Sequence, residues 1–137
     1  MARKCKALRL VGIVALAVFA TSDLSAQIPC PVMLVSGNTG HDTITLSFRN
    51  KGKLPIEQLI LSCSPSPYRK TGNSSCHTES GVFFPGMQYS INLAYPNAGK
   101  RQVVLSVREA VLSSGAHWDF SSSDKCRSLR VSSRTSR

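Results

Sequence analysis

The chain has 137 residues and carries 17 Lys or Arg against 7 Asp or Glu, a formal net charge of +10. This length suits one domain of ordinary size. We interpret the basic charge first as that of a solvated surface, with attraction to acidic polymers or anionic membrane surfaces as the alternative. Nucleic acid is not expected as a partner, because the sequence contains no recognisable nucleic-acid-binding motif.

The first 26 residues have the three parts of a secretory signal peptide. A basic start with four Lys or Arg precedes the apolar run Leu10–Ala20, and a small-residue stretch ends at Ala26. This order is typical of a cleaved leader, and eleven apolar residues are too few for a membrane span, which needs roughly 20. We expect cleavage after Ala26, with Ala20 as the alternative. The mature chain 27–137 would then have no membrane span and be secreted, periplasmic or held in the cell envelope.

Four cysteines remain in the predicted mature chain once Cys5 leaves with the leader. In an oxidising compartment an even number of cysteines indicates disulfides, and four cysteines allow three pairings. We favour Cys63–Cys76, which closes a polar loop rich in Ser, Pro and Gly, and Cys30–Cys126, which joins the start of the domain to its end.

A metal site is the alternative use of these cysteines. The sequence supplies zinc-type ligands, namely Cys63 and Cys76 with His41, His77 and His117. Their spacing matches no common zinc motif, in which ligands lie two to four residues apart in pairs. We therefore expect no metal and no cofactor.

Alternating apolar and polar residues predict β-strands along most of residues 27–131. The segment Val103–Leu112 also fits helical spacing, but its β-branched residues favour a strand. Turn signals recur about every 8–12 residues, which is typical of an antiparallel β-sandwich of about seven strands. In chain order we expect strands at Val32–Val35, Ile44–Arg49, Ile56–Cys63, Gly81–Phe84, Met87–Tyr95, Val103–Val107 and His117–Phe120, with Leu129 and Val131 as candidates for a last one.

Two sequence motifs resemble bacterial immunoglobulin-like domains. The segment Thr45–Ile56 contains a strand followed by Asn50-Lys51-Gly52 and, after a short spacer, Ile56. The later segment Phe84–Tyr89 contains a Pro-Gly step into the next strand. The resemblance implies an immunoglobulin-like β-sandwich and no particular function, since such domains serve binding, spacing and scaffolding roles.

Catalytic candidates are confined to a short cluster near the end of the predicted domain. Ser113, Ser114, His117 and Asp119 lie close in sequence, and a small secreted hydrolase would use His117 and Asp119. No Gly-x-Ser-x-Gly motif occurs, and the carboxylates form no evident pair. We therefore expect a non-enzymatic interaction or structural module, with a hydrolase as the rival.

Two places offer binding chemistry. Tyr68, Arg69 and Lys70 place an aromatic beside two cations in the loop that the Cys63–Cys76 disulfide would close. We interpret this loop first as an ordinary solvated loop. The alternative is that, with the disordered basic tail 132–137, it binds an acidic polymer or a glycan, while the partner of a purely structural module would be an unknown protein. Trp118 is either a core residue or an exposed platform for sugar stacking, and the sequence favours the core.

Overall fold

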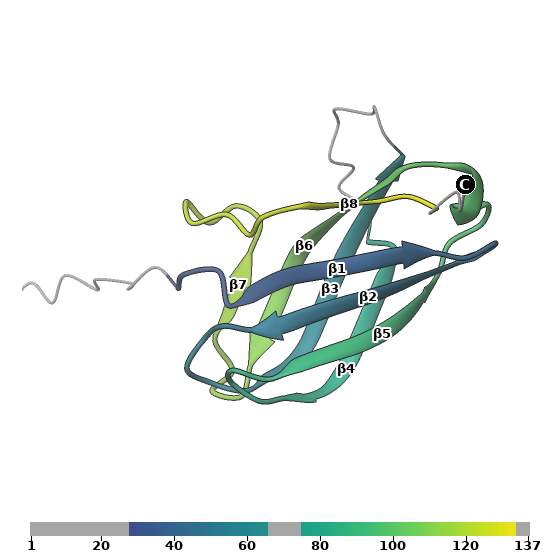
Figure 1. Cartoon of the computed structure of the whole chain (residues 1–137). Helices are drawn as coiled ribbons and strands as arrows, with labels where there is room; N and C mark the ends of the chain where they lie inside the picture. Colours follow the sequence, from purple (N-terminus) through teal and green to yellow (C-terminus); the bar gives the residue numbers. More distant parts are fainter. Residues whose placement is uncertain (1–27, 66–74, 134–137) are drawn as a thin grey trace, which may run out of the picture.

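The computed structural model describes residues 28–65 and 75–133, which form two antiparallel sheets (Figure 1). The smaller sheet has the order β1-β2-β5, with β1 at Val32–Thr39, β2 at Thr43–Asn50 and β5 at Gln88–Ala94. The larger sheet has the order β4-β3-β6-β7, and β8 also pairs with β6. Its strands are β3 at Ile56–Pro65, β4 at His77–Phe83, β6 at Val103–Leu112, β7 at His117–Asp119 and β8 at Leu129–Val131.

The described part of the chain contains no α-helix, as expected. Its one helical turn is the three-residue 3₁₀ segment η1 at Ala98–Lys100. No helix within these residues is long and apolar enough to cross a membrane.

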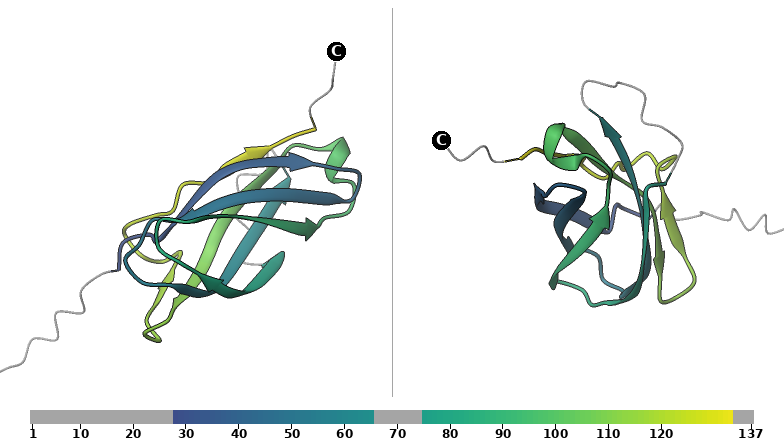
Figure 2. Two further views of the ribbon diagram at one scale, coloured as in Figure 1. Left: turned by 60° about the horizontal axis from the view of Figure 1, so that its bottom comes forward. Right: turned by 90° about the vertical axis from the view of Figure 1, so that its right-hand side faces the viewer.

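The core lies between the two sheets, which pack face to face (Figure 2). Side chains of alternate strand residues point to the same face, so the period-two pattern supplies one apolar face per sheet. Ile44, Leu46 and Phe48 of β2 are fully buried against the inward side chains of β3 and β6. The sequence of Val103–Leu112 fitted both helical and strand spacing. The segment is a strand because it pairs with β3 along its whole length.

Three features of the strands differ from the sequence predictions. β1 continues to Thr39 through a bulge between Leu34 and Ser36, although Ser36–Gly40 had the composition of a turn. β4 begins at His77 rather than Gly81 because it pairs with β3 from Leu61 onward. Phe120 lies beyond the end of β7 and is exposed, so it does not share a buried face with Trp118.

The short strand β8 lies beside β1 and closes one side of the sandwich (Figure 2). Hydrogen bonding joins β8 to β6 in the larger sheet, with Val103 opposite Val131. A Cβ at Gly37 would lie 2.4 Å from Cγ1 of Val131. Glycine is therefore required at position 37 for β1 and β8 to approach so closely.

Asn50, at the end of β2, is fully buried, and its side-chain amide joins both sheets. The Nδ2 group donates hydrogen bonds to the carbonyl of Leu54 at 2.9 Å and to that of Phe83 at 2.8 Å. The Oδ1 atom accepts a hydrogen bond from the N–H of Gly52 at 2.9 Å. The Asn-x-Gly motif thus forms a turn that the side-chain amide of Asn50 stabilises. The same amide also fixes the end of β4 through Phe83.

The backbone of Asn50 holds the Pro-Gly step in the same way. Its carbonyl accepts the N–H of Gly86 at 2.7 Å, and its N–H donates to the carbonyl of Met87 at 3.2 Å. Gly86 has φ 77°, a backbone angle that favours glycine. The two motifs that suggested a family resemblance therefore meet in space at Asn50.

The structure contains two disulfides, Cys30–Cys126 and Cys63–Cys76, which are the pairs favoured from the sequence. The first joins residues 96 positions apart and ties the start of the domain to the segment before β8. The second joins residues 13 positions apart and links the end of β3 to the start of β4. Two disulfides in one small domain indicate an oxidising, extracytoplasmic setting.

We predict that Asn50→Ala lowers the free energy of unfolding by roughly 2–4 kcal/mol, because it leaves the buried carbonyl of Phe83 and two partly buried backbone groups without their partner. Urea denaturation would measure the loss. The matched control is Asn92→Ala, whose amide bonds Thr45 on the exposed face; it should change stability by less than about 0.5 kcal/mol. Equal losses in the two variants would contradict the role assigned to Asn50.

We also predict that the two disulfides differ in their contribution to stability. On the chain-entropy model, a loop of about 15 residues gains about 3 kcal/mol and one of about 100 residues about 4.7 kcal/mol. The Cys30→Ser/Cys126→Ser variant should therefore be less stable than Cys63→Ser/Cys76→Ser. Urea midpoints of both variants, measured beside the parent protein, test this order, and the reverse order would refute it.

Candidate functional site

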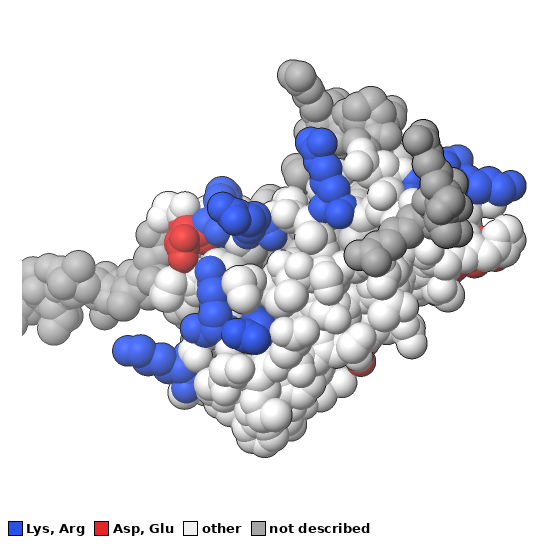
Figure 3. Space-filling view, in the orientation of Figure 1, with Lys and Arg blue, Asp and Glu red and all other residues white. Residues whose placement is uncertain are grey.

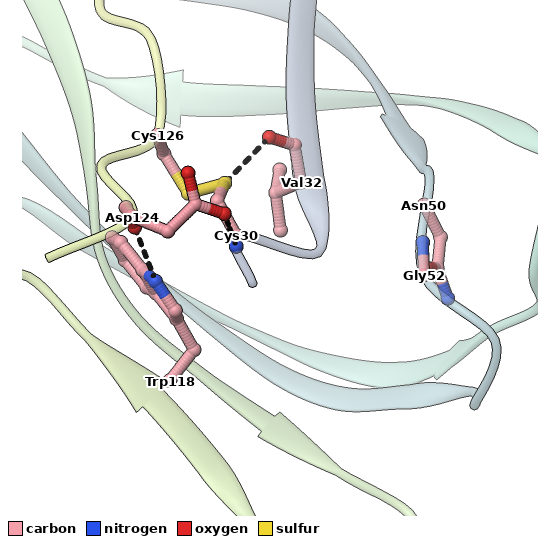
Figure 4. Close-up of a disulfide and its surroundings, with 7 residues drawn as sticks. All are labelled: Cys30, Val32, Asn50, Gly52, Trp118, Asp124 and Cys126. Atoms are coloured by element: carbon pink, nitrogen blue, oxygen red, sulfur yellow. Dashed lines mark hydrogen bonds between the residues drawn. A yellow bond between two sulfur atoms is a disulfide. The ribbon is translucent and has the colours of Figure 1, made fainter. Parts of the chain in front are cut away.

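Trp118 is a core residue and is only 2% exposed. Its indole Nε1 donates a hydrogen bond to the backbone carbonyl of Asp124 at 2.9 Å (Figure 4). The carboxylate of Asp124 accepts the N–H of Cys30 at 2.7 Å. Trp118 therefore anchors the segment between β7 and β8, and its buried ring offers no face on which a sugar could stack.

The loop with Tyr68, Arg69 and Lys70 lies outside the described residues, so its binding role stays a prediction. The structure does describe the two strand ends that flank the loop, and the Cys63–Cys76 disulfide holds them with a Cα–Cα distance of 5.6 Å. Of the predicted basic tail, residues 134–137 also lie outside the described part.

His117 and Asp119 lie on β7, but their neighbours do not form a nucleophile–base–acid chain. His117 Nδ1 lies 3.5 Å from Glu109 Oε1 on β6. The Asp119 carboxylate instead accepts hydrogen bonds from the hydroxyl and from the backbone N–H of Ser121. The Ser114 hydroxyl accepts the N–H of Ala116 at 3.4 Å. Ser114, His117 and Asp119 thus each have a local partner other than the one a triad requires.

Hydrogen bonding also sets the charge of Asp119. The Ser121 hydroxyl and then the Ser121 N–H lower the pKa of this carboxyl below its usual value, with smaller contributions from the charges of His117 and Lys125. A carboxyl with a lowered pKa stays ionised at neutral pH, which suits a turn-stabilising group rather than a general acid.

The zinc-type residues are also engaged elsewhere. Cys63 and Cys76 share a disulfide and cannot act as thiolate ligands. His77 Nε2 lies 2.6 Å from Glu79 Oε2 on the same strand, and His41 Nε2 lies 3.6 Å from Asp42 Oδ2. Within the described ranges, no three His, Cys, Asp or Glu side chains gather as a metal site would require.

One surface feature was not predicted from the sequence. Met87 was expected to belong to the alternating series of its strand, but it precedes β5 and its side chain is 54% exposed. Leu54, Val82 and Phe84 are exposed as well, and all four residues lie on segments that meet near Asn50. The signal in the sequence was a hydrophobic residue, Met87, at the start of a predicted strand. The alternating pattern of that strand predicted that Met87 would be buried.

Comparison with known proteins identifies no family for this chain. No family model matches it, and no curated protein is significantly similar to it. Among solved structures, the X-ray structure of Northeast Structural Genomics Consortium target SoR45 matches with TM-score 0.40 and 12% identity, covering 77% of this chain and 85% of that chain. A β-glucosidase from Kluyveromyces marxianus matches with TM-score 0.38 and 15% identity, covering 73% of this chain. This chain spans 14% of the β-glucosidase, and likenesses at this level carry no argument about function.

We predict that the intrinsic fluorescence of Trp118, the single tryptophan of the sequence, is that of a buried indole. Its emission should be blue-shifted and poorly quenched by iodide, and both properties should change on unfolding in urea, because the core excludes solvent from the ring. Adding soluble oligosaccharides should leave the emission unchanged. Efficient iodide quenching in the native state would instead show an exposed ring.

Proposed function

We propose that this protein is an exported, non-enzymatic interaction or structural module, located in the cell envelope or secreted medium. The observation that carries the proposal is the pair of disulfides in a domain of this size. Disulfides persist in oxidising compartments, and they stabilise small exported domains with moderate cores. The signal peptide predicted at residues 1–26 supplies the route of export.

Within this proposal the domain is an immunoglobulin-like β-sandwich. Two antiparallel sheets, packed face to face, and the meeting of the Asn-x-Gly and Pro-Gly motifs at Asn50 support this assignment. Domains of this architecture present their loops at the ends of a rigid scaffold, where binding residues are commonly found.

A more specific candidate is a binding module for an acidic polymer or a glycan, which would use Tyr68, Arg69, Lys70 and the basic tail. The Cys63–Cys76 disulfide supports it, because a loop closed at its ends loses less conformational freedom on binding. Binding of this kind should weaken steeply as salt rises, since salt screens exposed charges. The rival hydrolase would lose turnover on His117→Ala while keeping its fold, whereas a structural module would show neither effect.

The intact mass of the protein purified from its native export route tests the proposed setting. We expect a chain that starts near Gln27 and gains about four hydrogens on reduction, because two disulfides should form during export. A full-length chain with free thiols would overturn the proposal. The measurement needs no knowledge of the partner and is independent of any binding assay.

A further inference from the structure

One end of the sandwich presents an exposed apolar surface, which we call the apolar tip. It consists of four of the seven large hydrophobic side chains that are exposed within the described residues. They are between 42% and 54% exposed, and hydrophobic side chains exposed together at one place are typical of interaction sites. The members of the apolar tip are Leu54, Val82, Phe84 and Met87.

The hydrogen bonds of Asn50 bring these residues together from three segments. Its amide bonds the carbonyls of Leu54 and Phe83, and its N–H bonds the carbonyl of Met87. The N–H of Met87 in turn bonds the carbonyl of Phe84 at 3.3 Å. The backbones of the apolar tip are therefore fixed at neighbouring points before any partner arrives, which lowers the entropy cost of binding.

Cations flank the apolar tip. Lys51 and Lys53 are exposed on the β2–β3 turn, which also carries Leu54, and Arg49 lies at the end of β2 opposite Gln88. Figure 3 shows several Lys and Arg side chains gathered at the end of the molecule where β2 finishes. Among the described residues, all three close ion pairs involve histidine, so these cations are not neutralised by a carboxylate at contact distance.

One carboxylate adjoins the apolar tip in sequence. Glu57 is exposed on β3, three residues after Leu54. Asp124 lies beside the Cys30–Cys126 disulfide and apart from Asn50 (Figure 4); Lys125 and Arg127 neighbour it in sequence, and its carboxylate accepts the Cys30 N–H. On the segments that adjoin the apolar tip, Arg49, Lys51 and Lys53 outnumber Glu57, so the local charge is positive and Glu57 is the acidic residue that opposes it.

We propose that the apolar tip docks on an anionic lipid surface, with its hydrophobic side chains in the interface and Lys51 and Lys53 at the headgroups. This inference rests on the proposed export, which brings the domain to the outer side of a membrane. Apolar burial combined with attraction to anionic headgroups is the chemistry by which proteins lie on membranes. A second copy of this chain would place like charges together, and an acidic polymer would leave the hydrophobic side chains without a partner.

Vesicle flotation tests the proposal with the protein purified from its export route. The probes are vesicles of pure phosphatidylcholine and of phosphatidylcholine containing a minor fraction of phosphatidylglycerol. We expect binding to the second alone, and a fall of at least about ten-fold on Lys51→Glu/Lys53→Glu. Phe84→Ser should also weaken binding, whereas Glu57→Gln should strengthen it, because it removes the opposing charge.

Matched controls separate the apolar tip from general charge and hydrophobicity. Lys100→Glu/Arg101→Glu changes two cations at η1, beside the opposite end of β2. Phe120→Ser removes an exposed phenyl ring that is not part of the apolar tip. Both controls should bind vesicles as the parent protein does. Thermal unfolding of every variant verifies that its fold is intact.

Three results would overturn the proposal. They are no binding to phosphatidylglycerol vesicles, equal loss in tip and control variants, and capture by polyglutamate that Phe84→Ser leaves unchanged. The last would favour an acidic polymer. The intact-mass measurement distinguishes failure of the docking inference from failure of the proposed function. A cleaved protein with two disulfides that does not bind vesicles is exported but does not dock on lipid.

Discussion

The buried amide of Asn50 is the interaction on which the arrangement of the strands depends. An amide has two donors and an acceptor with two lone pairs, and burying it without partners is costly. Here it bonds the turn after β2, the entry to β3 and the end of β4, while its backbone holds the start of β5. One residue thus connects the smaller sheet to the larger at the end where hydrophobic and cationic side chains reach the surface.

The other connection between distant parts of the chain is the Cys30–Cys126 disulfide with Trp118 and Asp124 (Figure 4). This group holds the first described residues against the segment that leads into β8. β8 can then lie beside β1 and cover the edge of the core, which a strand of three residues could not do alone.

The side chains that were candidates for catalysis, metal binding or ligand binding in the described part of the chain have structural partners instead. Trp118 and Asp124 stabilise a loop, Asp119 stabilises the turn through Ser121, and two of the cysteines close the ends of β3 and β4. Among the described residues, the side chains that face solvent are cations, carboxylates such as Glu57, neutral polar groups and exposed hydrophobic residues that include the apolar tip. The apolar tip and its flanking cations are the basis of the docking inference made above, whereas the proposed export rests on the two disulfides.

Much of this fold could be predicted from the sequence, because strand periodicity is a local property. The alternation in Ile44–Phe48 predicts β2, and the polar composition between Cys63 and Cys76 favours their pairing. Neither the extension of β1 past Ser36 nor the exposure of Met87 could be predicted, since pairing partners far along the chain decide both. The role of Asn50 was also hidden: its motif indicates a turn, but only the tertiary structure brings the carbonyl of Phe83, 33 residues away, to its amide. The sequence by itself determined that the domain is built from strands and where most of them lie, because alternation is local, whereas long-range pairing and packing decided where those strands begin and end and which side chains are buried.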